Sequence, residues 1–474
     1  MGGVMADLSE RDITNIVQYV MAELKQRGDA AVPATGIFPD LSRAVSAASV
    51  AQSTWMALPL EKRKQVIAHL RERLREHAQV LAWAAWRETG LGRYEDKIEK
   101  NLLNINKVPG IEDLEPIAWS GDHGLTLMER APFGVCGSIT PVTNPTATVI
   151  GNSIAMIAAG NSVVFNAHPS AKECSARTIA IINQAIVEAG GPANLVAGVA
   201  EPTIESAQEL MKHPGTRLTL VTGGEAVVHV AMQSGKRAIC AGPGNPPVVV
   251  DETADLDEAA RGIIKGASFD NNIICTDEKN IIAVDAIADR LLAALRGLGC
   301  RILSQDEMAR LEKVIFSEPA KPGKATGLNK KLIGQNPSVI LKEIGVTVGD
   351  EVRLAIAEVP REHTLVWTEQ MMPILPFVRV PNADDAIDFA IAVEGGRRHT
   401  AVIYSRHLDH LSRYAKEADV SIFVKNGPNL AGLGYGGEGF CSFSIAGTTG
   451  EGMTRPRTFT RERRCVLVDA FRIV

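Results

Sequence analysis

The pattern of apolar and polar positions changes character along the chain. Over residues 13–24, six apolar side chains recur at three- and four-residue spacing, which predicts an amphipathic helix. Residues 27–36 have the composition of a linker. A short amphipathic helix on a tether cannot bury its apolar stripe within itself, so we expect residues 1–24 to dock on a partner protein. Folding back onto its own subunit is the alternative.

From Leu41 onward the spacing is helical, including a long run at 61–88. Near Gly134 short apolar runs begin to alternate with helical segments. The pattern predicts strands at 135–140, 162–165, 218–222 and 247–251, and helices at 147–159 and 172–189. Strands that alternate with helices indicate an α/β fold with a parallel sheet covered on both faces. Residues 463–468 are predicted to form a further strand, a candidate for pairing with another subunit.

Length and composition narrow the class of protein. A chain of 474 residues is long enough for two or three domains, and 45% hydrophobic with 22% charged residues is typical of a soluble globular protein. The net charge of -5 argues against nucleic acid or a membrane as partner. No apolar run has the length of a membrane span, and no secretory leader pattern is present, so we expect a cytoplasmic protein. Seven scattered cysteines without a CxxC pair fit a reducing compartment and predict no metal site.

The segment 268–279 carries the strongest chemical signal. Cys275 follows a polar turn and an apolar pair, and the run 276–278 after it predicts the start of a helix. At the amino end of a helix, the amide dipoles favour the thiolate over the thiol. A thiolate attacks carbonyl carbon, so this segment predicts covalent catalysis on an aldehyde or acyl group. A buried structural cysteine is the alternative.

Several segments are candidates for binding a cofactor. Residues 432–437 satisfy the dinucleotide pattern GxGxxG, but the sequence after them is typical of a loop, so we interpret them as a glycine-rich active-site or interface loop. Better candidates follow the predicted strands at 140–145, 166–169 and 222–225. Open α/β sheets bind ligands at the carboxyl ends of their strands.

Taken together, the ordered motifs resemble the aldehyde dehydrogenase superfamily, specifically its CoA-acylating branch, and most of all the propionaldehyde and acetaldehyde dehydrogenases of bacterial microcompartments. The motifs are Glu-Thr-Gly at 88–90, Ile-Thr-Pro-Val-Thr-Asn-Pro at 139–145, Val-Thr-Gly-Gly-Glu at 221–225, Gly-Pro-Gly-Asn-Pro-Pro at 242–247, the cysteine segment at 270–279, and the segments 369–373 and 423–428. The resemblance covers residues 38–474, and residues 1–24 resemble the targeting peptides of microcompartment enzymes.

The resemblance implies a division into domains. A targeting helix and linker would occupy residues 1–37. A Rossmann-type NAD- and CoA-binding domain would span 38–241, interrupted near 115–131 by a β-hairpin. An α/β catalytic domain would follow at 242–445, and a small β oligomerisation segment at 446–474. The expected assembly is a homo-oligomer, either a dimer or a tetramer, with residues 1–24 bound to shell or core proteins of a microcompartment.

The resemblance also implies roles for single residues. Cys275 corresponds to the nucleophile, and Asn144 to the amide that, with the Cys275 backbone N–H, binds the developing oxyanion. Glu369 corresponds to the carboxylate that holds the nicotinamide ribose, and Ile274 and Thr276 flank the substrate pocket. Asn166 stands where many relatives carry a lysine that contacts the adenine ribose. The expected cofactor-binding residues are Thr140, Pro141, Val142, Asn166, His168, Pro169, Thr222, Gly223, Gly224, Gly242 and Glu369.

The residue at position 241 distinguishes acyl transfer to coenzyme A from hydrolysis within this superfamily. Hydrolytic members of the superfamily carry a glutamate that activates water, and here Ala241 stands at that position. Since alanine cannot accept a proton, the acyl-enzyme would wait for a better nucleophile, which in this branch is coenzyme A. The expected reaction is oxidation of a short aldehyde, propionaldehyde in preference to acetaldehyde, with NAD and CoA to acyl-CoA and NADH. Hydrolysis to a carboxylate and an assembly protein without activity are the alternatives.

Overall fold

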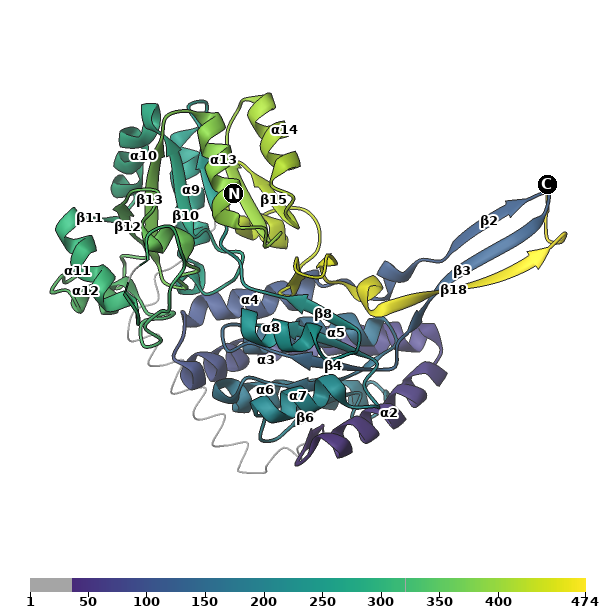
Figure 1. Ribbon diagram of the computed structural model, residues 1–474. Coiled ribbons are helices and arrows are strands. Elements are labelled where there is room, and N and C mark those ends of the chain that lie inside the picture. Colours follow the sequence, from purple (N-terminus) through teal and green to yellow (C-terminus); the bar gives the residue numbers. More distant parts are fainter. Residues whose placement is uncertain (1–35, 320) are drawn as a thin grey trace.

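The computed structural model describes residues 36–319 and 321–474. The amphipathic helix expected at residues 1–24 lies outside the described residues. The described residues form two large parallel sheets, a three-stranded antiparallel sheet and a two-stranded antiparallel sheet, together with the helices (Figure 1). The expected α/β class is therefore confirmed. No helix in the described ranges is both long and apolar enough to pass through a membrane.

A six-stranded parallel sheet forms the first half, with the strand order β1-β6-β5-β4-β7-β8. Its strands are β1 Ile37–Phe38, β4 Val135–Ile139, β5 Ser162–Asn166, β6 Val196–Val199, β7 Leu218–Thr222 and β8 Ala238–Ala241. The central strands β4, β5 and β7 are buried along their whole length. Strands buried on both faces read as continuous apolar runs, which is why the sequence predicted them to within one residue.

Helices cover both faces of this sheet. They are α2 Leu41–Ala57, α3 Leu60–Thr89, α4 Tyr94–Lys107, α5 Pro145–Ala158, α6 Lys172–Glu188, α7 Ile204–Lys212 and α8 Glu225–Met232. Apolar side chains of α2, α7 and α8 pack together on one face, and those of α3 to α6 contribute to a second cluster. Every residue of α5 is buried, so this central helix is enclosed on all sides and cannot move without disturbing its neighbours.

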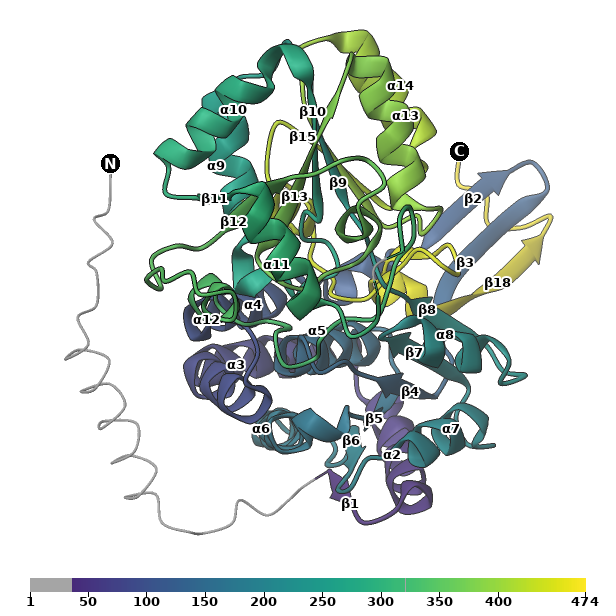
Figure 2. The same ribbon diagram turned by 60° about the vertical axis from the view of Figure 1, so that its left-hand side comes forward.

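A seven-stranded parallel sheet forms the second half, in the order β11-β12-β13-β10-β9-β14-β15. Figure 2 shows α9 and α10 on one side of it and α13 and α14 on the other. The strands are β9 Pro247–Val250, β10 Asn280–Val284, β11 Arg301–Leu303, β12 Ala355–Glu358, β13 Ile374–Val380, β14 Thr400–Tyr404 and β15 Ile422–Lys425. The helices are α9 Leu256–Ala267, α10 Asp285–Gly297, α11 Gln305–Ile315, α12 Pro337–Lys342, α13 Ala383–Glu394 and α14 Leu408–Glu417.

A three-stranded antiparallel sheet projects from the body of the molecule (Figure 1). It consists of β2 Ile117–Gly121, β3 Gly124–Pro132 and β18 Thr460–Val468, with β3 in the centre. The strand predicted at 463–468 is therefore present, and within this chain it pairs with β3. Because β18 lies at the edge of the sheet, one side of its backbone has no strand partner among the described residues.

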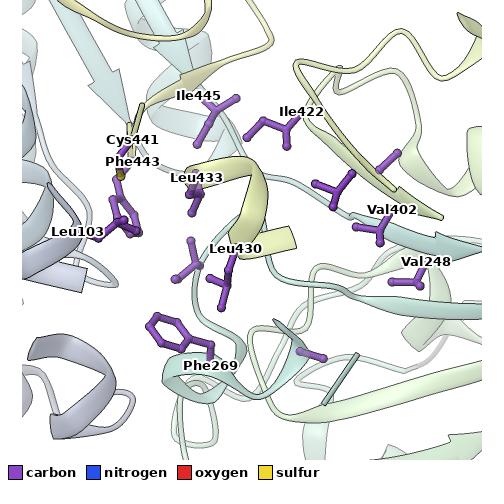
Figure 3. Close-up of a cluster of buried hydrophobic side chains, with 14 of the residues drawn as sticks. Leu103, Val248, Phe269, Val402, Ile422, Leu430, Leu433, Cys441, Phe443 and Ile445 are labelled. Carbon is purple, nitrogen blue, oxygen red and sulfur yellow. The ribbon is translucent and has the colours of Figure 1, made fainter. Parts of the chain in front are cut away.

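The segment between β15 and β18 joins the two halves of the molecule. It contains the short helix η5 Asn429–Leu433 and the small hairpin β16 Ile445–Ala446 and β17 Gly452–Met453. Leu430 and Leu433 pack beside Phe269, in one cluster that includes Leu103 of α4 and Phe443 (Figure 3). Gly432 and Leu433 of the GxGxxG run end η5, and residues 434–437 lie in a loop with no helix or strand before Ile445. This packing fixes one sheet relative to the other.

Candidate active site

A cavity of about 680 Å³ lies where the carboxyl ends of the first sheet meet the loop that carries Cys275. Both expected catalytic residues, Cys275 and Asn144, line it. So do all the expected cofactor positions, namely Thr140, Pro141, Val142, Asn166, His168, Pro169, Thr222, Gly223, Gly224, Gly242 and Glu369. The structure thus gathers residues that are up to 229 positions apart in sequence, from Thr140 to Glu369, around one space.

The two expected substrate-pocket residues are placed differently. Ile274 and Thr276 flank Cys275 but are fully buried and do not line the cavity. The Thr276 hydroxyl accepts a hydrogen bond from Asn429 Nδ2 at 3.2 Å. Their role in substrate selection stays a prediction. The apolar wall instead includes Ile273, Met371 and Phe443, which the sequence did not single out as pocket residues.

Asn144 stands immediately before α5, where Pro145 occupies the first helical position. Its side chain does not cap the helix. The amide nitrogen Nδ2 donates to Thr143 Oγ1 at 3.1 Å, and the amide oxygen Oδ1 accepts from Lys100 Nζ at 2.5 Å. The oxygen is therefore occupied by a buried cation, and the second N–H of the amide is available to a ligand.

Three consecutive left-handed residues shape the loop before Cys275. The φ angles of Asp270, Asn271 and Asn272 are 45°, 55° and 65°. This conformation is uncommon outside glycine, although Asn and Asp tolerate it better than other residues. Buried hydrogen bonds hold it: Asn272 Nδ2 donates to Ala267 O and Glu278 O, and Lys279 Nζ donates to Asn272 O at 2.7 Å. Such a conformation at a site of chemistry is over-determined by its surroundings.

The helix predicted to start at 276–278 is absent, and that prediction was wrong. The chain passes from the short helix η3 Phe269–Asn272 through a turn into β10. Asp277 Oδ2 accepts from the Ile274 N–H at 3.0 Å, and Asp277 Oδ1 accepts from Asn429 Nδ2 at 3.1 Å. Asp277 thus closes a local turn and binds a distant side chain. It does not open a helix.

The predicted stabilisation of the thiolate is therefore wrong for the protein without ligands. Although Cys275 reaches the cavity, burial raises the pKa of its thiol to about 12, and the nearby Glu369 carboxylate acts in the same direction. The Lys279 ammonium opposes this shift without cancelling it. The sulfur is consequently a thiol at neutral pH until something in the complex favours the anion.

The raised pKa of Cys275 should change how the rate of its alkylation depends on pH. Iodoacetamide reacts with the thiolate, so labelling of Cys275 in the ligand-free enzyme should keep accelerating from about pH 8 to about pH 10, because the thiol pKa is raised to about 12. A cysteine in an unstructured peptide with blocked termini, whose thiol pKa is about 8.5, should level off in that range. Peptide mapping separates Cys275 from the exposed Cys465. A plateau at Cys275 below about pH 8 would show that the thiolate is already favoured.

Two further ionisable groups lie beside the nucleophile. Glu369 Oε1 accepts from the Gly244 N–H at 3.2 Å, and burial raises the pKa of Glu369. His399 is buried next to Gly244, whose position is so tight that a Cβ there would lie 2.4 Å from the Cys275 carbonyl oxygen. Burial lowers the pKa of His399 to about 3, so its imidazole is neutral. Its Nε2 has no hydrogen-bond partner among the described residues. The sequence did not reveal His399, since no nearby motif marks it.

The cavity fits a nicotinamide dinucleotide at several points. The Thr140 hydroxyl is buried, lines the cavity and has no partner among the described residues, as expected of a group that bonds a ligand. At Gly224, before α8, a Cβ would meet nothing within 4 Å, so open space adjoins the backbone there. Glu369 supplies a carboxylate of the kind that binds ribose hydroxyls. These residues would hold the cofactor.

The side chain of Asn166 is hydrogen-bonded within the protein through both its nitrogen and its oxygen. Its Nδ2 donates to Thr203 O at 3.2 Å, and its Oδ1 accepts from Ser206 Oγ. The side chain therefore ties the end of β5 to the start of α7. Since no lysine or arginine lines this cavity among the described residues, no cation stands ready for a ribose phosphate there. Asn166, where many relatives carry a lysine, therefore contributes no positive charge to the cavity wall and instead links β5 to α7.

Ala241 ends β8 and lines the cavity. Its methyl group occupies the place expected for a water-activating glutamate. Among the described residues that line the cavity, Glu369 carries the one carboxylate, and no group of His, Cys, Asp and Glu there could hold a metal ion. Nothing at the Ala241 position can take a proton from water.

Comparison with known proteins defines the family. Residues 32–309 match the aldehyde dehydrogenase family. Acetaldehyde dehydrogenase (acetylating) EutE of Escherichia coli is 50% identical over 470 residues, which cover 98% of this chain and 100% of the relative. Propanal dehydrogenase (CoA-propanoylating) of Citrobacter freundii is 44% identical over 467 residues, covering 98% and 100%. The chain therefore belongs to the aldehyde dehydrogenase family.

Solved structures give the same assignment. A propionaldehyde dehydrogenase from the fucose utilisation microcompartment of Clostridium phytofermentans has a TM-score of 0.90 at 44% identity, covering 93% of this chain and 100% of that chain. A propionaldehyde dehydrogenase of Rhodopseudomonas palustris, with bound CoA and an acylated cysteine, has a TM-score of 0.90 at 45% identity, covering 93% and 99%. The recognition of the family and of its CoA-acylating branch is confirmed.

Proposed function

We propose that this chain oxidises a short aldehyde with NAD and coenzyme A to acyl-CoA and NADH. The observation that carries the proposal is the combination within one cavity of Cys275, the Asn144 amide and the methyl group of Ala241. A nucleophile and an oxyanion donor support acylation of the cysteine. The missing water-activating base leaves the acyl group for another nucleophile. The named activities of the relatives support the same reaction.

We infer the order of the reaction steps from the residues that line the cavity. Cys275 sulfur attacks the aldehyde carbon, and because burial keeps the thiol protonated, the S–H bond breaks as the C–S bond forms and the proton is released to solvent. The free N–H of Asn144 binds the oxygen of the resulting thiohemiacetal as its negative charge develops. When bound, the oxidised nicotinamide supplies the hydride acceptor for this carbon. The product on the protein is an acyl thioester of Cys275.

CoA then releases the acyl group. Exchange between two thioesters is nearly balanced in energy, so its thiol needs less activation than water does. CoA and the dinucleotide both carry an adenosine diphosphate portion, and one cavity of about 680 Å³ can receive them in turn after NADH leaves. The reaction is therefore a double displacement with ping-pong kinetics.

Omission of CoA tests this reaction. With aldehyde and NAD alone, we expect NADH to form in a burst of about one equivalent per active site and then to stop, because the acyl-enzyme persists. Addition of CoA should restore steady turnover with acyl-CoA as product. Steady NADH production without CoA, with a carboxylate as product, would instead establish the hydrolytic alternative.

The substrate is proposed to carry two or three carbons, with propionaldehyde preferred to acetaldehyde. Ile273, Met371 and Phe443 make part of the cavity wall apolar, which suits a short alkyl group. The two curated relatives described above are named for acetaldehyde and for propanal, so both substrates stand within the proposal. Measuring kcat/KM with CoA for aldehydes of two to five carbons decides the preference, and a maximum at five carbons would contradict it.

We infer that the small antiparallel sheet joins subunits into a dimer or tetramer. Its Trp119 and Val468 are 49% and 70% exposed, and one edge of β18 has no strand partner within residues 36–319 and 321–474. Exposed apolar groups beside a free strand edge are typical of a pairing surface. Light scattering should give a multiple of the 50.7 kDa chain mass. Val468→Asp should lower that multiple, and a monomeric parent protein would exclude the inference.

We propose that residues 1–24 direct the enzyme into a bacterial microcompartment by binding shell or core proteins. The apolar stripe in the sequence and the microcompartment source of a similar structure support this assignment. Removal of residues 1–24 should leave kcat/KM unchanged and disperse the enzyme in cells. The same segment fused to a fluorescent protein should gather it inside shells. A fusion that stays dispersed would favour folding back onto the subunit.

A further inference from the structure

We propose that Lys100 is a positioning residue for the reaction, whose ammonium fixes the orientation of the Asn144 amide and links that amide to the loop that carries Cys275. This inference rests on the proposed function, because it assigns the oxyanion to Asn144. Lys100 lies on α4 and does not line the cavity, so it acts through its neighbours and not on the substrate.

The Lys100 ammonium has three hydrogen-bond partners. Its side chain is 2% exposed. Nζ donates to Asn144 Oδ1 at 2.5 Å, to Thr143 O at 3.3 Å and to Asp270 Oδ2. An ammonium group has three N–H donors and no acceptor, so its full capacity is used by these partners. A buried cation with this set of partners is held in one place.

This arrangement determines which end of the Asn144 amide faces Lys100. A carboxamide has an accepting end and a donating end, and they differ little in shape. Only the oxygen can face an ammonium group, so the nitrogen must point elsewhere, and one of its N–H groups reaches Thr143 Oγ1. The remaining N–H is the donor that an oxyanion requires. Without Lys100, rotation of the amide would present its oxygen to the oxyanion, which repels it.

Lys100 also reaches the nucleophile loop. Asp270 is fully buried and begins the left-handed stretch that leads to Cys275. Its carboxylate accepts from Lys100, from Lys97 Nζ at 3.0 Å and from the Arg93 backbone N–H at 2.7 Å. Since the second oxyanion donor is the Cys275 backbone N–H, Lys100 contacts the supports of both donors. The two donors come from opposite halves of the molecule, and one ammonium group joins them.

The charge state of Lys100 fits this role. Burial lowers the pKa of Lys100 to about 8, and the Asp270 carboxylate opposes that shift. Asp270 therefore helps to keep Lys100 in the ammonium form that can only donate. The neighbouring Lys97 acts against it by repulsion, yet both lysines share the same carboxylate oxygen.

Lys97 provides a matched control. It lies one turn earlier on α4, is equally buried at 2% exposure and bonds Asp270, but it has no hydrogen bond to Asn144. Lys97→Met and Lys100→Met both remove a buried ammonium from Asp270 and leave the other in place. A loss that comes only from disturbing the fold should be similar in the two variants.

The test measures the NADH burst and steady turnover in both variants. Lys100→Met is expected to slow the burst by about tenfold to a hundredfold, approaching the loss found when an oxyanion donor is removed, while KM for NAD and for CoA changes little. Lys97→Met is expected to keep the burst within about threefold of the parent enzyme. Lys100→Arg, which retains a cationic donor, should recover part of the lost rate.

A double-mutant cycle then separates positioning from stability. In the Asn144→Ala background there is no amide to orient, so adding Lys100→Met should cost less than about threefold. If Lys100→Met does not fold, Lys100→Gln takes its place in the same cycle.

Equal losses for the two lysines, or full additivity with Asn144→Ala, would overturn the proposal. An inactive parent enzyme would instead refute the proposed function itself.

Discussion

Cys275→Ala is expected to abolish aldehyde oxidation, with kcat/KM falling by more than about 10⁴-fold, because Cys275 is the one cysteine among the described residues that line the cavity. Cys275 lines the cavity, whereas the expected contacts to the dinucleotide come from Thr140, the 223–224 turn and Glu369. NAD should therefore still bind, and calorimetry with the variant checks this directly. The loss should appear in both the NADH burst and steady turnover.

Cys465→Ala is the control for this variant. Cys465 is exposed on β18, in the small antiparallel sheet that projects from the body. Its removal should leave kcat/KM within about twofold, because no residue of β18 lines the cavity. Retention of CoA-dependent activity by Cys275→Ala would refute the assignment of the nucleophile, because the acyl thioester could not then form on this sulfur.

Asn144→Ala is expected to have the next largest effect, a loss of about 10²–10³-fold in kcat, or about 2–4 kcal/mol of transition-state stabilisation. The amide N–H that is not bonded to Thr143 is the donor lost. Because a similar oxyanion forms when CoA attacks the thioester, the loss should affect both halves of the reaction. Stopped-flow measurement of the NADH burst, together with a single turnover of the acyl-enzyme with CoA, resolves them.

Asn166→Ala gives a useful comparison. Asn166 is another amide on the cavity wall, but both of its polar side-chain atoms already bond Thr203 and Ser206 at the start of α7. We expect it to alter KM for NAD more than the rate of the burst. A negligible effect of Asn144→Ala on the burst, or an equal effect of the two substitutions, would argue against an oxyanion role for Asn144.

Much of the parallel-sheet fold could be predicted from the local pattern of apolar and polar residues. The strands β4, β5, β7 and β9 are buried on both faces, so their sequences are short apolar runs bounded by turns. The rule that parallel sheets bind ligands at the carboxyl ends of their strands then located the cavity residues from Thr140 to Gly224. The roles of Cys275 and Asn144 came from the resemblance to a family, because spacing alone does not assign them.

Two predictions were wrong, the helix start at 276–278 and the stabilised thiolate of Cys275, and both errors have causes far away in the sequence. The run 276–278 has the composition of a helix start, but Asp277 bonds Asn429, which lies 152 residues later in the chain. Burial, which no local pattern reveals, raises the pKa of Cys275 when a helix end would have lowered it. Tertiary contacts override local propensity at this loop.

The buried lysines were missed for a similar reason. Lys97 and Lys100 lie on a helix rich in charged residues, where a solvent-exposed face is the usual interpretation. Their partner Asp270 is 170 residues away from Lys100 in sequence. The one local signal was a set of polar residues at helical spacing, at positions 97, 100, 101 and 104, and it does not distinguish a solvated stripe from a buried network.

The most direct test of the central claim is the mass of the protein after incubation with propionaldehyde and NAD in the absence of CoA. A propionyl adduct that maps to the peptide containing Cys275, and that disappears with release of propionyl-CoA when CoA is added, is the predicted result. An unmodified Cys275 under conditions in which NADH forms would contradict the account.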